Sequence, residues 1–181
     1  RSTLFPYTTL FRSRDNNGHG LIFTKTISVD DDFVFTITDK VKNCGTNSVN
    51  LRNYLLIRRE LKKNDSESMG FYHGPIGYFD GKLKEIGYDD IEKEKEISYQ
   101  SKGGWFGITD KYWLVSFIPE KNSSYSANYK FLGNNTYSVE SNDSMSIVHP
   151  SAEFSKTHHL FIGAKEINTL DMYEEKLDIS R

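Results

Sequence analysis

Residues Gly103 to Pro119 read GGWFGITDKYWLVSFIP, and this stretch decides the fold class. From Tyr112 to Ile118 nearly every residue is apolar on both alternating faces, whereas a half-buried surface strand would alternate with polar residues. The run therefore predicts a central strand that is covered on both faces. Pro119 ends this strand because proline has no amide hydrogen to donate to a ladder, and the glycine pair before Trp105 allows a tight bend.

The composition points to one all-β domain in a chain of 181 residues. Turn-forming residues recur at short intervals, and 14% aromatic against 36% hydrophobic residues favours an antiparallel sandwich or barrel over a helical bundle. The net charge of −2 offers no basic surface, so we expect no nucleic-acid partner. The single cysteine, Cys44, excludes an internal disulfide and a multi-cysteine metal site. No apolar run is long enough to span a bilayer, and we expect the chain as given to be soluble.

The first thirteen residues, RSTLFPYTTLFRS, differ in pattern from everything that follows. They match, letter for letter, the in-frame translation of a widely used short-read sequencing adapter. We therefore interpret residues 1–13 as an artefact that is not part of the fold, and we expect them to pack poorly. A cleaved signal peptide explains them less well because they contain no apolar core. On this interpretation the natural sequence starts near Arg14, as an internal fragment.

Alternating segments between Asn- and Ser-rich turns predict further short strands. The clearest are Phe33–Thr38, Tyr125–Phe131, Thr136–Val139, Ser144–Val148 and His158–Phe161. Asp80-Gly81 predicts a two-residue hairpin turn, since a type I′ turn needs positive φ at both positions. The charge run Asp89–Glu96 fits either one or two helical turns or a solvated edge.

After Gly163 the apolar period changes from that of a strand to that of a helix. Ile167, Leu170, Tyr173 and Leu177 fall on one face at helical spacing. The sequence therefore predicts a β domain over residues 14–163, followed by an amphipathic helix within residues 164–181.

The residues that could carry chemistry do not form a recognisable site. His158 and His159 are neighbours on a predicted strand, so their rings point to opposite faces and do not converge on one metal ion. His73 and His149 flank prolines in turns, and Asp110 and Lys111 flank the central strand. The 25 acidic residues leave a carboxylate pair for glycoside chemistry open. We predict no catalytic residue, no cofactor-binding residue, no cofactor and no metal ligand, and interpret the chain as a binding or scaffolding domain rather than an enzyme.

Four blocks of residues, in this order along the chain, resemble the large periplasmic domain of the YidC family of bacterial membrane protein insertases. They are Gly18–Leu21 with Thr26–Asp31, Gly74–Gly77 with Leu83–Glu85, Gly103–Trp105 with Thr109–Trp113 and Ile118-Pro119, and Phe161–Glu166 with Leu170 and Tyr173. The block GGW…TDKYW…IP is the most specific of the four. Their order and spacing over nearly all of residues 14–181 carry the resemblance.

The resemblance implies a β-supersandwich related to mutarotase-like folds, with a C-terminal helix that leads toward a helical membrane core. It implies a non-catalytic domain on the periplasmic side of the bacterial inner membrane. The parent protein, anchored in the membrane, would assist insertion and folding of nascent membrane proteins with the Sec translocon. Contact with SecF is expected within Leu61–Lys102. The membrane anchor, the opening strands of the domain and the insertase core would lie outside this chain, leaving exposed strand edges or apolar patches.

Two other functions remain open from the sequence. A carbohydrate-binding or mutarotase-like β-sandwich would need His73, His149 and a carboxylate to line one concave pocket. A separate secreted domain would need an upstream signal peptide in place of a membrane anchor.

Overall fold

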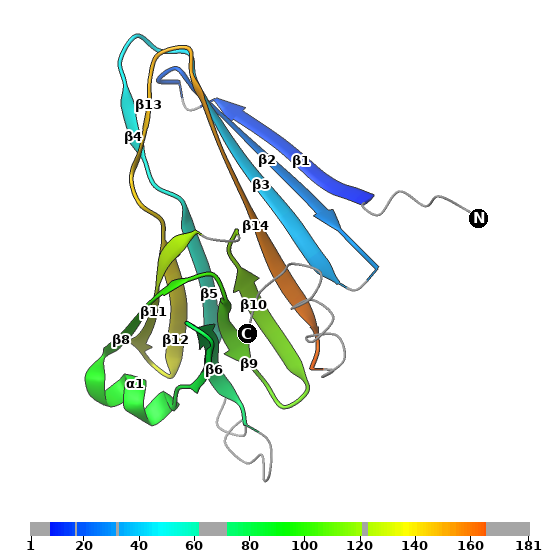
Figure 1. Ribbon diagram of the computed structural model, residues 1–181, viewed down its shortest axis with the longest axis vertical. Helices are drawn as coiled ribbons and strands as arrows, with labels where there is room; N and C mark the ends of the chain where they lie inside the picture. Colours follow the sequence, from blue (N-terminus) through cyan, green and yellow to red (C-terminus); the bar gives the residue numbers. More distant parts are fainter. Residues whose placement is uncertain (1–7, 17, 32, 62–71, 121–122, 166–181) are drawn as a thin grey trace, which may run out of the picture.

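The computed structural model describes residues 8–16, 18–31, 33–61, 72–120 and 123–165. These residues form antiparallel sheets and one short helix, α1 (Tyr88–Glu94), as Figure 1 shows. The all-β prediction is confirmed. Within the described residues no helix has the length and apolar character needed to cross a membrane. The predicted C-terminal helix lies outside the described residues, apart from Ala164, which ends a strand, and Lys165, which is not helical.

The large sheet has eight strands. Their order is β1 (Thr8–Asn16), β2 (Leu21–Val29), β3 (Val34–Asn43), β14 (Glu153–Ala164), β10 (Trp113–Ile118), β9 (Trp105–Thr109), β6 (Gly74–Phe79) and β7 (Lys82–Glu85). Four strands form the second sheet, in the order β5 (Tyr54–Glu60), β12 (Thr136–Asn142), β11 (Ser124–Gly133) and β8 (Glu96–Lys102). Two short strands, β4 (Val49–Leu51) and β13 (Ser146–Val148), make a separate ribbon.

The predicted central strand is β10, which lies between β14 and β9 in the interior of the large sheet. Leu114 and Ile118 are buried in a cluster on one face, and Phe117 is buried on the other face. The prediction is wrong at its first two residues, because Tyr112 is 62% exposed and Trp113 is 59% exposed. Trp113 begins the strand and borders an open pocket rather than the packed second sheet, and Tyr112 lies before the strand.

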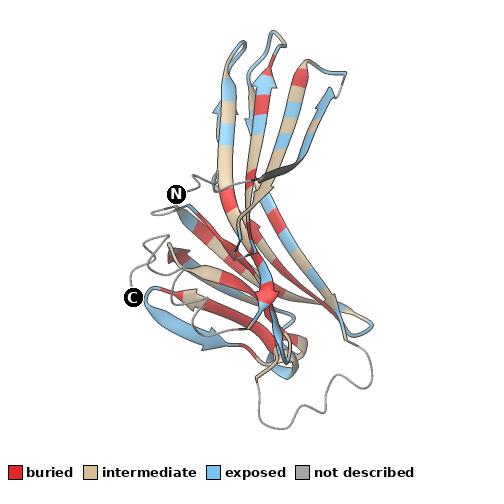
Figure 2. Ribbon diagram, turned by 90° about the vertical axis from the view of Figure 1, so that its right-hand side faces the viewer, coloured by how far each residue is buried: buried red, intermediate tan, exposed pale blue. Residues whose placement is uncertain are grey.

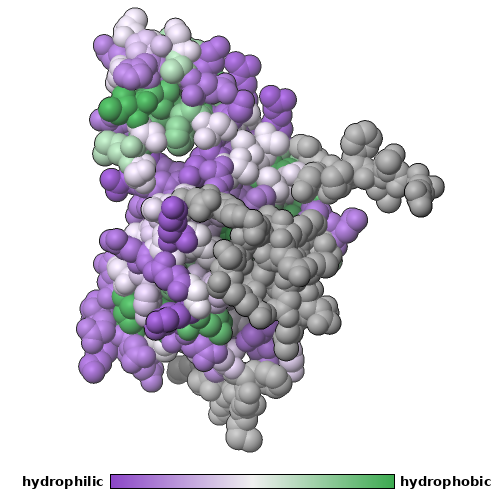
Figure 3. Space-filling model, viewed as in Figure 1, coloured by the Kyte–Doolittle hydropathy of each residue, from purple (hydrophilic) through white to green (hydrophobic). Residues whose placement is uncertain are grey.

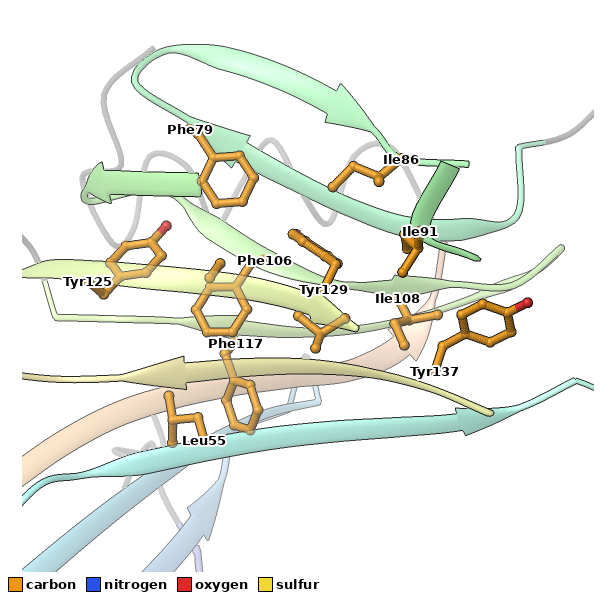
Figure 4. Packing of buried hydrophobic residues seen from close by; sticks show 12 residues of the cluster. Leu55, Phe79, Ile86, Ile91, Phe106, Ile108, Phe117, Tyr125, Tyr129 and Tyr137 are labelled. Atoms are coloured by element: carbon orange, nitrogen blue, oxygen red, sulfur yellow. The ribbon is translucent and has the colours of Figure 1, made fainter. Parts of the chain in front are cut away.

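The main core fills the space between the two sheets (Figure 4). Phe106 is fully buried, and its ring centroid lies 5.2 Å from that of Tyr125 and 5.8 Å from that of Phe117. Tyr129 is also fully buried, and its hydroxyl donates a hydrogen bond of 3.0 Å to the Ile76 carbonyl of the opposite sheet. Burial of one such aromatic side chain contributes about 1.5–3 kcal/mol, so this core fixes the two sheets against each other.

The predicted Asp80-Gly81 hairpin joins β6 and β7, and both residues have positive φ, 48° and 77°. The charge run that follows it forms helix α1 rather than an extended edge. Ile91 explains this outcome: it is the buried residue of α1 and belongs to the main core. Tyr88, the first residue of α1, also packs against this core, with its ring centroid 4.4 Å from that of Tyr137, so two apolar side chains among charged neighbours dock the helix.

The N-terminal segment differs from its prediction. Thr8–Ser13 form the first part of β1 and pair with β2, from Thr8 opposite Val29 to Ser13 opposite Lys25. The expectation that residues 1–13 are not part of the fold is therefore wrong for Thr8–Ser13. The physical reason is that an edge strand is held by main-chain hydrogen bonds, which almost any sequence can form. Phe11 stays 51% exposed, and the origin of the segment remains a prediction.

Candidate binding groove

The inner face of the large sheet extends beyond the second sheet. Figure 1 shows β1, β2, β3 and the first part of β14 projecting past the four-stranded sheet, with the β4–β13 ribbon opposite them. In Figure 2 the buried residues concentrate where the two sheets overlap, and the projecting strands are mostly intermediate or exposed. Two pockets lie along this mismatch in sheet size, and we call them together the groove.

The upper part of the groove is a pocket of about 450 Å³. It is lined by Phe11, Ser13, Asp15, Phe23, Thr24, Lys25, Asp39, Lys40, Val41, Leu51, Arg52, Asn53, Tyr54, Phe154 and Lys156. The strand registers place Phe23, Val41 and Phe154 side by side as an apolar row. Leu51 to Tyr54, at the start of β5 and before it, form the facing wall. This pocket is an apolar floor with a polar rim.

A charged row crosses the same floor next to the apolar row. Lys25 and Asp39 are paired across β2 and β3, with 2.5 Å between Nζ and Oδ1. Lys156 continues the row on β14, and its Nζ lies 3.5 Å from Glu120 Oε2 and 3.6 Å from Asp143 Oδ2. Because these charges are compensated within the fold, they fix the floor instead of forming a reactive centre.

The lower part of the groove is a second pocket, of about 370 Å³, between β5 and the large sheet. It is lined by Ile57, Arg58, Arg59, Ile108, Asp110, Trp113, Val115 and Ile162. Arg59 crosses from β5 to Asp110 of the large sheet, with 2.6 Å between Nη2 and Oδ2. Trp113 and Ile162, which is 40% exposed, leave a large apolar surface open in this pocket.

The two neighbouring histidines lie on opposite faces of β14, as predicted. His158 is 3% exposed, and its ring packs edge-on against Phe117 with centroids 5.8 Å apart. Burial lowers the pKa of His158 to about 4, and its Nδ1 has no hydrogen-bond partner within the described residues. His159 shares a hydrogen bond of 3.1 Å with the Thr36 hydroxyl, and burial also lowers its pKa. Each of the two rings is therefore held by contacts within the fold, and the two do not form one site.

The other candidate residues do not converge. His73 and His149 line neither pocket of the groove, and His149 contacts the Ser48 hydroxyl at 3.0 Å. Cys44 is an exposed free cysteine. Over the described part of the chain, no group of three or more His, Cys, Asp or Glu side chains could hold a metal ion. The groove itself was missed by the sequence analysis, because it arises from the unequal sizes of two sheets and no local pattern encodes it.

Comparison with known families decides the assignment. The family model of the YidC periplasmic domain matches residues 11–180. The chain belongs to the YidC periplasmic domain family. Among curated relatives of the YidC domain, membrane protein insertase YidC of Rickettsia africae is 39% identical over 167 residues, and that of Rickettsia bellii is 38% identical over 167 residues. Each match covers 90% of this chain and 30% of the relative, so the chain spans about a third of the length of these insertases.

Solved structures similar to this YidC-family domain confirm the β-supersandwich. A GH36 α-galactosidase from Geobacillus stearothermophilus gives a TM-score of 0.61 at 10% identity, over 92% of this chain and 26% of the enzyme. A putative aldose 1-epimerase from Klebsiella pneumoniae gives 0.54 at 8% identity, over 93% and 53% of the two chains. At such identities the likeness shows the fold alone.

Membership of the YidC family settles two further predictions. The family is non-catalytic, and its domain lies on the periplasmic side of the inner membrane. The groove is therefore a candidate binding surface rather than a catalytic site.

Proposed function

We propose that this domain is the non-catalytic periplasmic part of a membrane protein insertase that assists insertion and folding of inner-membrane proteins with the Sec translocon. The match of the YidC periplasmic domain to residues 11–180 carries this proposal. The insertase relatives are about three times longer than the matched part, so the activity belongs to the whole parent protein.

The groove supports a role in contact with nascent membrane proteins. Its apolar row of Phe23, Val41 and Phe154 suits the apolar side chains of a client segment that has not yet entered the bilayer. The compensated pair of Lys25 and Asp39 beside this row would keep the floor rigid without attracting one specific charge. Such a surface suits many clients of different sequence.

Neighbouring residues of β14 provide a matched test of this contact. Phe154 lines the groove, whereas Ser155 is exposed and does not line it. A photo-crosslinking amino acid at position 154 of the domain, in the parent insertase in cells, should capture a nascent inner-membrane protein, and the same group at position 155 should not. Equal capture at both positions, or capture at neither, would count against the groove as the contact surface.

We further propose contact with SecF through Leu61–Lys102. Two edge strands support this choice: β7 ends the large sheet, β8 ends the second sheet, and both lie in this range together with α1. All residues of β7 are exposed. A crosslinker at Lys84 should therefore capture SecF in membranes, whereas one at Thr26, on the outer face of β2, should not. Capture of SecF from Thr26 but not from Lys84 would place the SecF contact outside Leu61–Lys102.

The carbohydrate alternative gains no support from the geometry. It needed His73, His149 and a carboxylate in one concave pocket, and neither histidine lines the pockets of the groove. The fold likeness to α-galactosidases does not supply a sugar site. A glycan array probed with the chain is the direct check, and saturable binding there would revive this function.

A further inference from the structure

The outer face of the large sheet, which is the face turned away from the second sheet, carries an apolar cluster of its own. Each of its buried side chains is at most 6% exposed. They are Val34, Ile76, Leu114, Ile118 and Phe161. Leu114 belongs to this cluster and Phe117 to the main core, and the two lie an odd number of positions apart on β10. The cluster and the main core are therefore on opposite faces of the sheet.

This outer cluster needs a covering layer. Side chains on one face of a sheet stay accessible to water unless a second layer of structure packs on them. The second sheet and α1 contribute residues to the main core and none to the outer cluster. Tyr72 and Trp105, which pack against the cluster, come from the segment before β6 and from the large sheet itself. No described strand or helix therefore supplies the layer that leaves Leu114 and Phe161 only 2% exposed.

The middle of the outer face is shallow. The strand registers place five residues in one row across β3, β14, β10, β9 and β6. In this order they are Val34, Phe161, Ser116, Gly107 and Ile76. Large side chains stand toward both ends of the row, and the small Ser116, which is 2% exposed, and Gly107 lie between them. Because protein interiors are close-packed, bulky side chains of the covering layer fill the space above these two residues.

Lys165, the last described residue, lies beside this face. Its N–H donates a hydrogen bond of 2.8 Å to the Tyr112 carbonyl, next to the start of β10. Its Nζ donates a hydrogen bond of 3.1 Å to the carbonyl of Tyr72, which packs against the outer cluster. Residues 166–181 therefore start within reach of the cluster.

These residues have the pattern and the length that a covering helix needs. Ile167, Leu170, Tyr173 and Leu177 fall on one face at helical spacing. As a helix, residues 166–177 would span about 18 Å. The five strands from β3 to β6 extend over about 19 Å, at roughly 4.8 Å between neighbours. One helix laid across the strands therefore matches the width of the cluster.

The other segments outside the described residues match this face less well. Residues 62–71 read KKNDSESMGF and carry mostly polar side chains. Residues 1–7 precede β1, which lies at the edge of the large sheet and is separated from β14 by β2 and β3. The C-terminal segment combines apolar side chains with a starting point at the cluster.

We propose that the outer face of the large sheet is the docking site of the chain's own residues 166–181, which pack on it as an amphipathic helix. Ile167, Leu170 and Tyr173 cover the outer cluster, and Glu175, on the opposite side of the helix, faces water. Docking holds the C-terminal segment against the sheet, so that the segment moves with the domain. This packing goes beyond the proposed insertase role and does not depend on it.

A cysteine in the middle of the row reports on the covering layer. Ser116→Cys in a chain that also carries Cys44→Ser provides a single thiol, and its modification by a maleimide is followed by mass spectrometry. Leu170→Lys and Glu175→Lys place the same side chain on opposite sides of the helix. Leu170→Lys should speed the modification at least about tenfold, and Glu175→Lys should change it less than about twofold. Circular dichroism of each protein confirms that it is folded.

Methyl NOEs in the unaltered chain test the same packing without any substitution. They are expected between the methyl groups of Leu114 or Ile118 and those of Ile167 or Leu170. If Leu170→Lys does not fold, these NOEs decide alone.

Four results would overturn the proposal. Two are equal modification rates in the two lysine variants and the absence of NOEs between the outer cluster and residues 166–181. The third is exposure of the thiol by Phe71→Lys but not by Leu170→Lys, which would assign the face to residues 62–71. The fourth is a loss of thiol protection on dilution, which would assign it to a second copy of the chain.

Discussion

Replacement of the buried His158 by leucine should remove a large part of the acid sensitivity of this domain. The imidazole is 3% exposed beside Phe117, and burial lowers its pKa to about 4 from the ordinary 6.5. The unfolded chain therefore binds a proton at pH values where the folded chain does not. Stability is fully present above pH 6.5 and falls as the pH drops from 6.5 toward 4.

The size of this effect follows from the two pKa values. One pH unit corresponds to about 1.4 kcal/mol, so protonation of His158 in the unfolded state costs the fold about 2 kcal/mol at pH 5. The cost reaches about 3 kcal/mol below pH 4. Against a typical domain stability of about 5–15 kcal/mol, this loss is readily measured.

Urea unfolding of both proteins at pH 7.5, 6 and 5 tests this prediction. At pH 7.5 the stabilities reflect packing alone, and this difference serves as the reference. By pH 5 the wild-type chain should lose about 2 kcal/mol more than the His158→Leu variant. His159 and the carboxyl groups contribute equally to both curves. Parallel pH curves for the two proteins would show that His158 is not held neutral by burial, and the reasoning would fail.

Two other predictions concern packing. Gly104→Ala should lower the free energy of unfolding by more than about 3 kcal/mol, because the new Cβ would lie 2.0 Å from the Tyr78 carbonyl oxygen and φ is 82°. Its control is Gly103→Ala, which has a similar φ of 77° but open space around the new Cβ. This control should lower the free energy of unfolding by about 1–2 kcal/mol. Equal melting temperatures would contradict the close approach. Phe106→Ala should lower the free energy of unfolding in urea by about 3–5 kcal/mol. The control Leu132→Ala, at an exposed position, should change it by no more than about 0.5 kcal/mol. Similar losses for the two variants would mean that Phe106 is not in the core.

Local patterns were sufficient for the elements that local chemistry determines. The Asp80-Gly81 turn was predictable because positive φ at two successive residues restricts the choice of side chain. The central strand β10 was predictable because few strands outside a sheet interior are apolar on both faces. The opposite orientation of His158 and His159 followed from the alternation of a strand alone.

Features that depend on distant segments were not predictable. Trp113 belongs to the apolar run that predicted the central strand, yet it is exposed because the second sheet does not cover the start of β10. The sequence also does not show that β14 continues from Glu153 to Ala164 and pairs with both β3 and β10. A comparable case is the β4–β13 ribbon, where Ile147 of β13 is 62% exposed. Figure 3 shows hydrophobic surface at this end of the molecule.

The outcome at the N-terminus bears on how the open edges behave. Thr8–Ser13 pair with β2 although their sequence matches an adapter translation, and Phe11 remains mostly outside any core. On the adapter interpretation, the edge of β2 accepts a strand that was never selected for it, through main-chain bonds alone.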